Sequence, residues 1–259
     1  MIKLENYEVV GWEHAIRGMR NPKNSWERSD SQYCIDSCDN CDNFSICNGN
    51  TESYFKRFWE EDPCDTNFAI GPNDHTLMMN LAKGGPVHAK YRRFIDVYVD
   101  ISAPLYWWKE FDTYKVGTAA NSCSTMHKIH DKEFTLEDFS CERLIADDAC
   151  IVYDIPLIDG RVDDTQLGFI DVLEITIDAL NSARQLYLDT KDKIYWWQMI
   201  QLLPSSYNQK RTVKLNYEVL ANIYTWRKDH KLDCWRDFCA WIETLPYSEI
   251  ITGGVDANE

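Results

Sequence analysis

The sequence predicts an α+β fold, with a small antiparallel or mixed sheet and a helical C-terminal half. The clearest strand is indicated over residues 95–101, where apolar and polar residues alternate as they do in a half-buried strand. From Ile170 onwards, apolar residues recur at helical spacing instead. The 259 residues show no internal repeat and no linker, so we expect a single domain over residues 1–259.

The N-terminal part of the chain predicts short elements around a cysteine-rich insertion. Residues 7–12 alternate as in a short strand, and a helical turn follows them. Residues 28–66 form the insertion, because this stretch is polar and rich in cysteine and its first part has neither helical nor strand periodicity. Asn73 or Asp74 is placed to cap a helix that ends at Gly84.

The rest of the chain predicts mainly helices. Pro104 suits the first position of an aromatic helix, and the small polar residues 117–125 indicate a loop or elbow. Pro204 marks the end of another helix. The further elements are a strand over 150–155 and helices over 170–187, 194–203, 215–226 and 232–245.

The charge balance excludes one class of function. The chain has 42 acidic and 27 basic residues and a formal net charge of −15. General binding to nucleic acid depends on Lys and Arg that neutralise phosphates, so we do not expect it here. A local basic pocket for one small phosphate remains compatible with this charge. The sequence shows no signal peptide and no apolar run long enough for a membrane span, so we expect a cytoplasmic protein.

The segment from Leu203 to His230 reads as the last helical segment of a ligand site. It carries Asn216, Asn222 and Arg227. Asn216 and Arg227 are eleven residues apart, which is about three helical turns, so they would share one face. A guanidinium beside two amides can hold an anion and a hydrogen-bonding ring together. The alternative interpretation is a solvated helix face with two incidental asparagines.

Four cysteines in the insertion have the spacing of metal ligands. Cys34, Cys38, Cys41 and Cys47 are separated by three, two and five residues. Four thiolates this close in sequence can close a tetrahedral zinc site. Two alternatives stay open: the cysteines carry no metal, or the first three hold an iron–sulfur cluster, for which C-x3-C-x2-C is a known spacing.

Small polar residues after Gly117 offer a possible phosphate site. Asn121, Ser122 and Ser124 supply hydrogen-bond donors at a predicted bend, and backbone amides with serine hydroxyls can hold a phosphate without lysine. A turn rich in serine and threonine is the alternative. Cys123 has two histidines nearby in the sequence, but we expect a buried, inert thiol rather than a nucleophile.

One locally basic cluster stands out in this acidic chain. His88 precedes Lys90, Arg92 and Arg93, and together they can serve an anionic ligand such as a cofactor. The alternative is that these cations pair with some of the 42 carboxylates.

The C-terminal residues resemble a known family, the flavin-dependent thymidylate synthases. That family has a Leu-Pro, a helix with two asparagines and a Leu-Arg, and the spacing matches here without a gap. The order of elements over residues 75–245 is similar too, while the cysteines of the insertion lie outside the resemblance. It is closest to a branch found in Gram-positive bacteria and their phages. The residues that carry the C-terminal resemblance are Leu203, Pro204, Thr212, Asn216, Leu220, Asn222 and Arg227.

The resemblance implies a homotetramer that binds FAD and a pyrimidine nucleotide where subunits meet. Its activity would be the reductive methylation of dUMP or a relative, with NADPH and methylenetetrahydrofolate as co-substrates. Asn216 and Asn222 would contact the flavin, with His88 as a further cofactor-binding candidate. Arg227 would bind the nucleotide.

The sequence also departs from the family's pattern. An Arg-His-Arg run should fall near residues 113–116, where Lys115 is the only cation. The family's Ser-x-Arg element ends in Met126 here, and a further arginine is replaced by Ile200. We therefore expect Lys115 to assist in substrate binding, and Lys109, Arg92 and Arg93 are alternatives for the same role. The second hypothesis is a non-catalytic nucleotide-binding or regulatory protein on the same scaffold, with a metal-stabilised cysteine loop.

Overall fold

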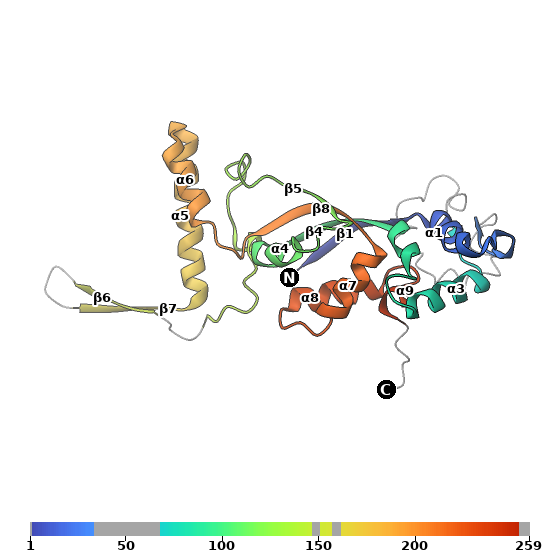
Figure 1. The fold of residues 1–259 in the computed structure, drawn as a ribbon. Helices are drawn as coiled ribbons and strands as arrows, with labels where there is room; N and C mark the ends of the chain where they lie inside the picture. The colour runs from blue at the N-terminus through green and yellow to red at the C-terminus, as the bar shows by residue number, and fades with distance from the viewer. Residues whose placement is uncertain (1, 34–67, 147–150, 157–161, 254–259) are drawn as a thin grey trace, which may run out of the picture. The chain divides into compact units, whose positions relative to one another are not determined.

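The computed structural model (Figure 1) describes residues 2–33, 68–146, 151–156 and 162–253. It confirms the predicted α+β class, with a small sheet and a helical C-terminal half. Within these ranges, the central sheet has four strands in the order β1-β4-β8-β5. These strands are β1 (Lys3–Val10), β4 (Asp96–Pro104), β8 (Asn208–Asn216) and β5 (Ala119–Ser122).

The chain packs as two compact units. The first unit contains the described residues of 102–113 and 121–211, and the second contains those of 2–101, 114–120 and 212–259. Strands β4 and β8 each contribute residues to both units.

The first unit is built around a helix pair. Its residues Phe134, Phe139, Leu180 and Met199 are buried in one apolar cluster, which confirms the amphipathic helix predicted after Ile170. Asp192 caps the second helix of the pair, because its carboxylate accepts the N–H of Ile194 at 3.0 Å. The elements are α4 (Leu105–Phe111), η5 (Leu136–Asp138), β6 (Ile151–Pro156), β7 (Val162–Leu167), α5 (Phe169–Thr190) and α6 (Lys193–Leu202).

The second unit contains the remaining helices and a core rich in aromatic residues. Trp12 packs edge-to-face against Tyr217 and Tyr247, with ring centroids 5.3 Å apart in both pairs. The short strands β2 (Gln32–Tyr33) and β3 (Phe68–Ala69) pair antiparallel. The helices are α1 (Trp12–Arg20), η1 (Asn21–Lys23), η2 (Trp26–Arg28), α3 (Pro72–Lys83), η4 (Lys90–Phe94), α7 (Tyr217–Arg227), α8 (Asp233–Glu243) and α9 (Glu249–Thr252).

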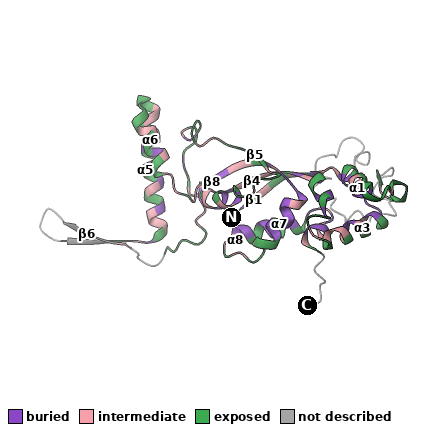
Figure 2. Cartoon of the chain, in the orientation of Figure 1, coloured by how far each residue is buried: buried purple, intermediate pink, exposed green. Residues whose placement is uncertain are grey.

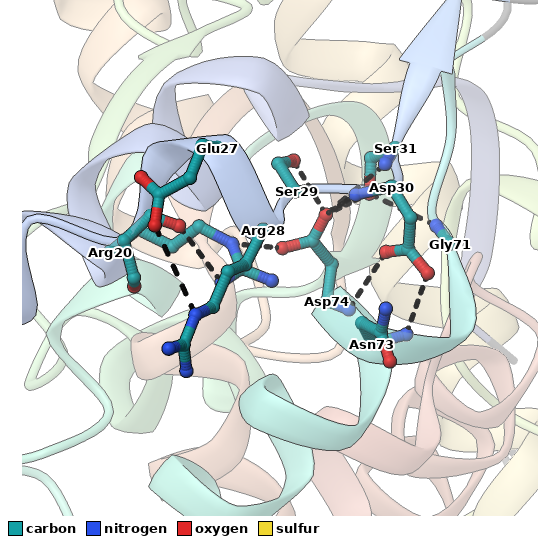
Figure 3. Close-up of polar contacts among 10 residues, drawn as sticks. Arg20, Glu27, Arg28, Ser29, Asp30, Ser31, Gly71, Asn73 and Asp74 are labelled. Carbon is teal, nitrogen blue, oxygen red and sulfur yellow. Dashed lines mark hydrogen bonds and ion pairs between the residues drawn. The ribbon is translucent and has the colours of Figure 1, made fainter.

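The start of α3 is capped from a distant part of the sequence. Its N-cap residue is Gly71, so neither Asn73 nor Asp74 is the cap that the sequence suggested. The carboxylate of Asp30 instead accepts the backbone N–H groups of Asn73 at 2.9 Å and Asp74 at 3.1 Å (Figure 3). A carboxylate at this end of a helix satisfies open N–H groups and complements the helix dipole.

The Asp74 side chain lies at the centre of a buried polar network. It is fully buried, and Arg20 donates to it at 2.6 Å while the hydroxyls of Ser29 and Ser31 each donate at 2.7 Å (Figure 3). Buried charges are stable only when they are paired and hydrogen-bonded, and this carboxylate meets both conditions. The network joins residues 29–31 to α3, and the β2–β3 pair lies beside it in the sequence.

Two further expectations about local structure were wrong. The stretch before Asn216 is the strand β8 rather than part of the last helical segment, since Val213 and Leu215 are buried while Thr212 and Lys214 are not. The predicted loop over 117–125 contains the strand β5. In both places the partner strands of the sheet determine the conformation, and the sequence of the segment alone does not reveal them.

The four candidate zinc ligands Cys34, Cys38, Cys41 and Cys47 lie outside the described residues. Within the described ranges, the structure shows no group of three or more His, Cys, Asp or Glu residues arranged to hold a metal ion. No helix in that part of the chain is long and apolar enough to cross a membrane.

Candidate functional site

Helix α7 carries the three residues that the sequence singled out, and it places them differently. Asn216 is the N-cap of the helix, where its side-chain oxygen accepts the N–H of Val219 at 3.1 Å, and it is only 6% exposed. Asn222 lies within the helix and is exposed, while Arg227 is the last helical residue and is half-buried. Most of α7 is buried, whereas α5 and α6 carry exposed and half-buried residues along their length (Figure 2).

Arg227 is held among aromatic rings at the C-terminal end of α7. Its Nε donates a hydrogen bond to the hydroxyl of Tyr114 at 2.9 Å. The centre of its guanidinium lies 4.7 Å from the ring centroid of Trp235 on α8 and 5.8 Å from that of Tyr114. Both distances are within the range of cation–π attraction, and a cation at this end of a helix also complements the helix dipole.

The segment 114–117, which we name the strap, joins the two ends of α7. It begins at Tyr114, the partner of Arg227, and ends at Gly117, which lies against the N-cap. A Cβ atom at Gly117 would be 2.8 Å from Nδ2 of Asn216, and the residue has a φ of +82°. Glycine is therefore required there both for the close approach and for the left-handed backbone.

Between its two fixed ends the strap presents exposed side chains. Lys115 is exposed, and Val116 is 92% exposed. The strap therefore brings Lys115 next to the helix that carries Asn216, Asn222 and Arg227. Proximity in sequence predicts none of this, because residues 114–117 and α7 are about a hundred positions apart.

The signals that could have identified the strap are weak. Tyr114 and Trp235 are ordinary aromatic residues in sequence, and the role of each depends on the other and on Arg227. Gly117 is the one local signal. A glycine in a polar stretch indicates a turn or loop, and here the residue has a positive φ.

The candidate phosphate residues belong to the first unit. Asn121 and Ser122 are exposed at the end of β5, and the hydroxyl of Ser124 accepts the N–H of His127 at 3.0 Å. Cys123 is exposed, so the expectation of a buried thiol was wrong. Its backbone is held on both sides, because its N–H donates to the Lys210 carbonyl at 2.9 Å and its carbonyl accepts from Gln209 at 3.1 Å.

Gln209 and its neighbour Arg211 were not identified from the sequence. Gln209 is buried, and besides holding Cys123 it accepts a hydrogen bond from Nε of Arg211 at 3.0 Å. The guanidinium of Arg211 lies 4.1 Å from the ring centroid of Trp108 and pairs with Asp112 at 2.7 Å. The segment with Ser122 and Ser124 is thus supported by a rigid polar arrangement on β8.

The basic cluster around His88 is divided by the fold. His88, Lys90 and Arg93 are exposed, so they remain accessible to an anion. Arg92 is buried, and its guanidinium lies 3.8 Å from the carboxylate of Glu218 in the first turn of α7. For Arg92 the structure therefore shows the alternative interpretation, a cation paired with a carboxylate.

Comparisons with known proteins identify the fold. No family model matches the sequence, and no curated protein matches it. The structure is similar to that of thymidylate synthase X from Helicobacter pylori crystallised with FAD and dUMP, with a TM-score of 0.55, 14% identity, and coverage of 96% of this chain and 94% of that one. A second crystal structure of the flavin-dependent enzyme from the same organism, also with FAD and dUMP, gives a TM-score of 0.53 and 15% identity, with 96% and 95% coverage. At these identities the likeness shows a shared fold over nearly the whole chain.

Proposed function

We propose that this chain is a cytoplasmic flavoprotein of the thymidylate synthase type. It binds FAD and a pyrimidine nucleotide, and it catalyses the reductive methylation of dUMP or a relative, with NADPH and methylenetetrahydrofolate as co-substrates. The fold it shares with two structures that hold FAD and dUMP supports the ligand class. The single observation that carries the proposal is the placement of Arg227, which contacts Tyr114 and Trp235, with the exposed Lys115 next to Tyr114 in the strap.

In this proposal the nucleotide phosphate is bound by the two cations. A phosphate requires charge-assisted hydrogen bonds, and a guanidinium supplies them in a fixed planar geometry. Tyr114 and Trp235 restrict the side chain of Arg227, so less conformational entropy is lost when an anion binds. Lys115 adds a second positive charge from the strap. Asn121, Ser122 and Ser124 are proposed as further hydrogen-bonding groups for the nucleotide.

Three candidate residues, two of them from α7 and its cap, fit a flavin in different ways. Asn222 presents an exposed amide, which offers both donors and an acceptor to the polar edge of a flavin ring. His88 is exposed and suited to the anionic part of the cofactor. Asn216 contributes by capping the first turn of α7, and it lies close against Gly117 at the end of the strap. FAD, when bound, supplies the redox chemistry, and the protein supplies binding and orientation.

A flavin titration tests this function. The purified protein is expected to show flavin absorbance at near equal molar occupancy, and added FAD should raise its melting temperature because a ligand that binds the folded state stabilises it. Conversion of dUMP to a methylated product with both co-substrates would establish catalysis. If saturating FAD neither binds nor raises the melting temperature, the flavin assignment is wrong.

A second candidate function is a nucleotide-binding or regulatory protein without catalysis. It is favoured by one feature of the site: in the strap, Lys115 is the only cation where the resemblance implies two arginines. This function would be supported if the protein binds FAD and dUMP but forms no methylated product with any reductant tested. The proposed homotetramer is tested by the mass of the protein in solution, and the proposed zinc site by metal analysis of protein purified without oxygen.

A further inference from the structure

Two large apolar side chains of the candidate site are exposed to solvent. Among the described residues, Val116 at 92% and Trp226 at 73% are the two most exposed large hydrophobic side chains. Both belong to the candidate site: Val116 lies in the strap, and Trp226 directly precedes Arg227 on α7. Single exposed apolar residues are common, but an exposed indole that directly precedes a candidate ligand-binding residue offers apolar surface to a ligand at that site.

Trp226 shares a face of α7 with Asn222. The two residues are four positions apart, so their side chains are neighbours one turn apart, about 6 Å along the axis. Both are exposed, whereas Ile223 and Tyr224 between them are buried. The exposed face of the helix therefore presents a hydrogen-bonding amide and a flat indole next to each other.

We propose that Trp226 is the residue on which the flavin ring of FAD stacks, with the amide of Asn222 at the polar edge of the ring. This inference rests on the proposed function. Indole and flavin are both flat aromatic systems, and such rings prefer an offset stack. Stacking would bury an indole that is otherwise 73% exposed, which adds a hydrophobic contribution to the free energy of FAD binding. A tricyclic ring with one polar side matches an indole and an amide placed one helical turn apart.

Flavin fluorescence provides a direct readout, because an indole in contact with the flavin ring quenches its emission by electron transfer. For wild-type protein we expect strong quenching when FAD binds. In Trp226→Ala we expect FAD affinity to fall by about tenfold or more, and the emission of the bound flavin to rise. Trp226→Phe keeps a stacking ring, so its affinity should stay within about threefold of wild type.

Trp26→Ala is the matched control, since Trp26 is a tryptophan of the same unit that is 49% exposed and lies outside the candidate site. This variant should bind FAD and quench its emission as the wild type does. Melting temperatures of the variants without ligand would show that each is folded.

The outcomes separate the inference from the function. If the wild type takes up no FAD, the proposed function fails. If the wild type binds FAD and Trp226→Ala binds it equally well with equal quenching, only the role of Trp226 is overturned. The inference is also overturned if Trp226→Ala weakens dUMP binding and leaves FAD binding unchanged. In that case Trp226 would stack on the pyrimidine base of the nucleotide instead of the flavin ring. A change in the mass of the assembly with unchanged FAD binding would assign Trp226 to a contact between copies instead.

Discussion

A Cβ atom at Gly117 would lie 2.8 Å from the side-chain amide nitrogen of Asn216. The same amide group, through its oxygen, caps α7 by accepting the N–H of Val219. One asparagine thus caps the start of the helix and lies close against the end of the strap. At the other end, Arg227 binds Tyr114. Both ends of the strap thus meet residues of α7 or its cap, and Lys115 lies between these ends.

Replacing Gly117 should therefore destabilise the protein in two ways. Gly117→Ala places a side chain in a left-handed conformation, which costs about 1–2 kcal/mol, and adds a clash with Asn216. We expect a total loss of about 2–4 kcal/mol of unfolding free energy. Chemical denaturation followed by tryptophan fluorescence measures it.

Gly85→Ala separates the two effects. Gly85 has a φ of +83°, nearly the same as Gly117, but a Cβ atom there would meet nothing within 4 Å. This variant should lose only about 1–2 kcal/mol. Equal losses in Gly85→Ala and Gly117→Ala would show that the contact with Asn216 contributes nothing.

Arg227 should be essential for nucleotide binding. Arg227→Ala removes the guanidinium that we assign to the phosphate. We expect the free energy of dUMP binding to fall by about 2–3 kcal/mol or more, enough to abolish the binding that calorimetry detects. Tyr114→Phe removes only the hydrogen bond from Nε of Arg227 and keeps the ring, so it should weaken dUMP binding by about 1 kcal/mol. Lys228→Ala changes the next, exposed cation and serves as the control. Unchanged dUMP affinity in Arg227→Ala would remove Arg227 from the site.

The buried carboxylate of Asp74 should make stability depend on pH. Burial alone raises the pKa of Asp74, but hydrogen bonds from Ser31, Ser29 and Arg20 and the charge of Arg20 outweigh it, so the pKa is lower than its usual value. Its contribution to stability is then fully present above the unfolded-state pKa of about 4 and is lost as the pH falls through the lower folded-state pKa. Asp74→Asn should be less stable at pH 7 and should lose less stability on acidification.

The cation that faces Asp74 is expected to matter as much as the carboxylate. Arg20→Ala leaves a buried charge without its partner, which should cost about 3–5 kcal/mol. The nearby pair Arg28–Glu27 is the matched control, because its atoms are 3.9 Å apart and both side chains are exposed (Figure 3). Arg28→Ala should change the unfolding free energy by less than about 1 kcal/mol. Denaturation with urea at neutral pH compares the two, and similar losses would contradict the assignment.

Two cysteines should differ in reactivity. Burial raises the pKa of Cys239 to about 12, with the charges of Glu243 and Asp229 adding to the effect, so very little thiolate is present at neutral pH. Cys123 is exposed. Iodoacetamide should therefore alkylate Cys123 in the folded protein much faster than Cys239, as measured by mass spectrometry of peptides. In denatured protein both should react alike, and fast alkylation of Cys239 in the native state would contradict its burial.

The sequence by itself determined those elements whose signal is local. Alternation over residues 95–101 predicted β4, and apolar spacing after Ile170 predicted α5, because each pattern reflects which side of its own element is buried. Pro204 correctly marked the end of α6. The prediction of a helix that contains Asn222 and Arg227 was also correct. The amide and guanidinium groups of these residues indicated a ligand site.

Only the tertiary structure decided how these elements meet. It made residues 208–216 a strand, moved Asn216 from the helix face to its cap, and placed Asp30 as the cap of a helix 43 residues later in the chain. It also joined the strap to α7 through Tyr114 and Gly117. Each of these contacts depends on the partner that the folded chain brings to a residue, and no periodicity within a segment records that partner.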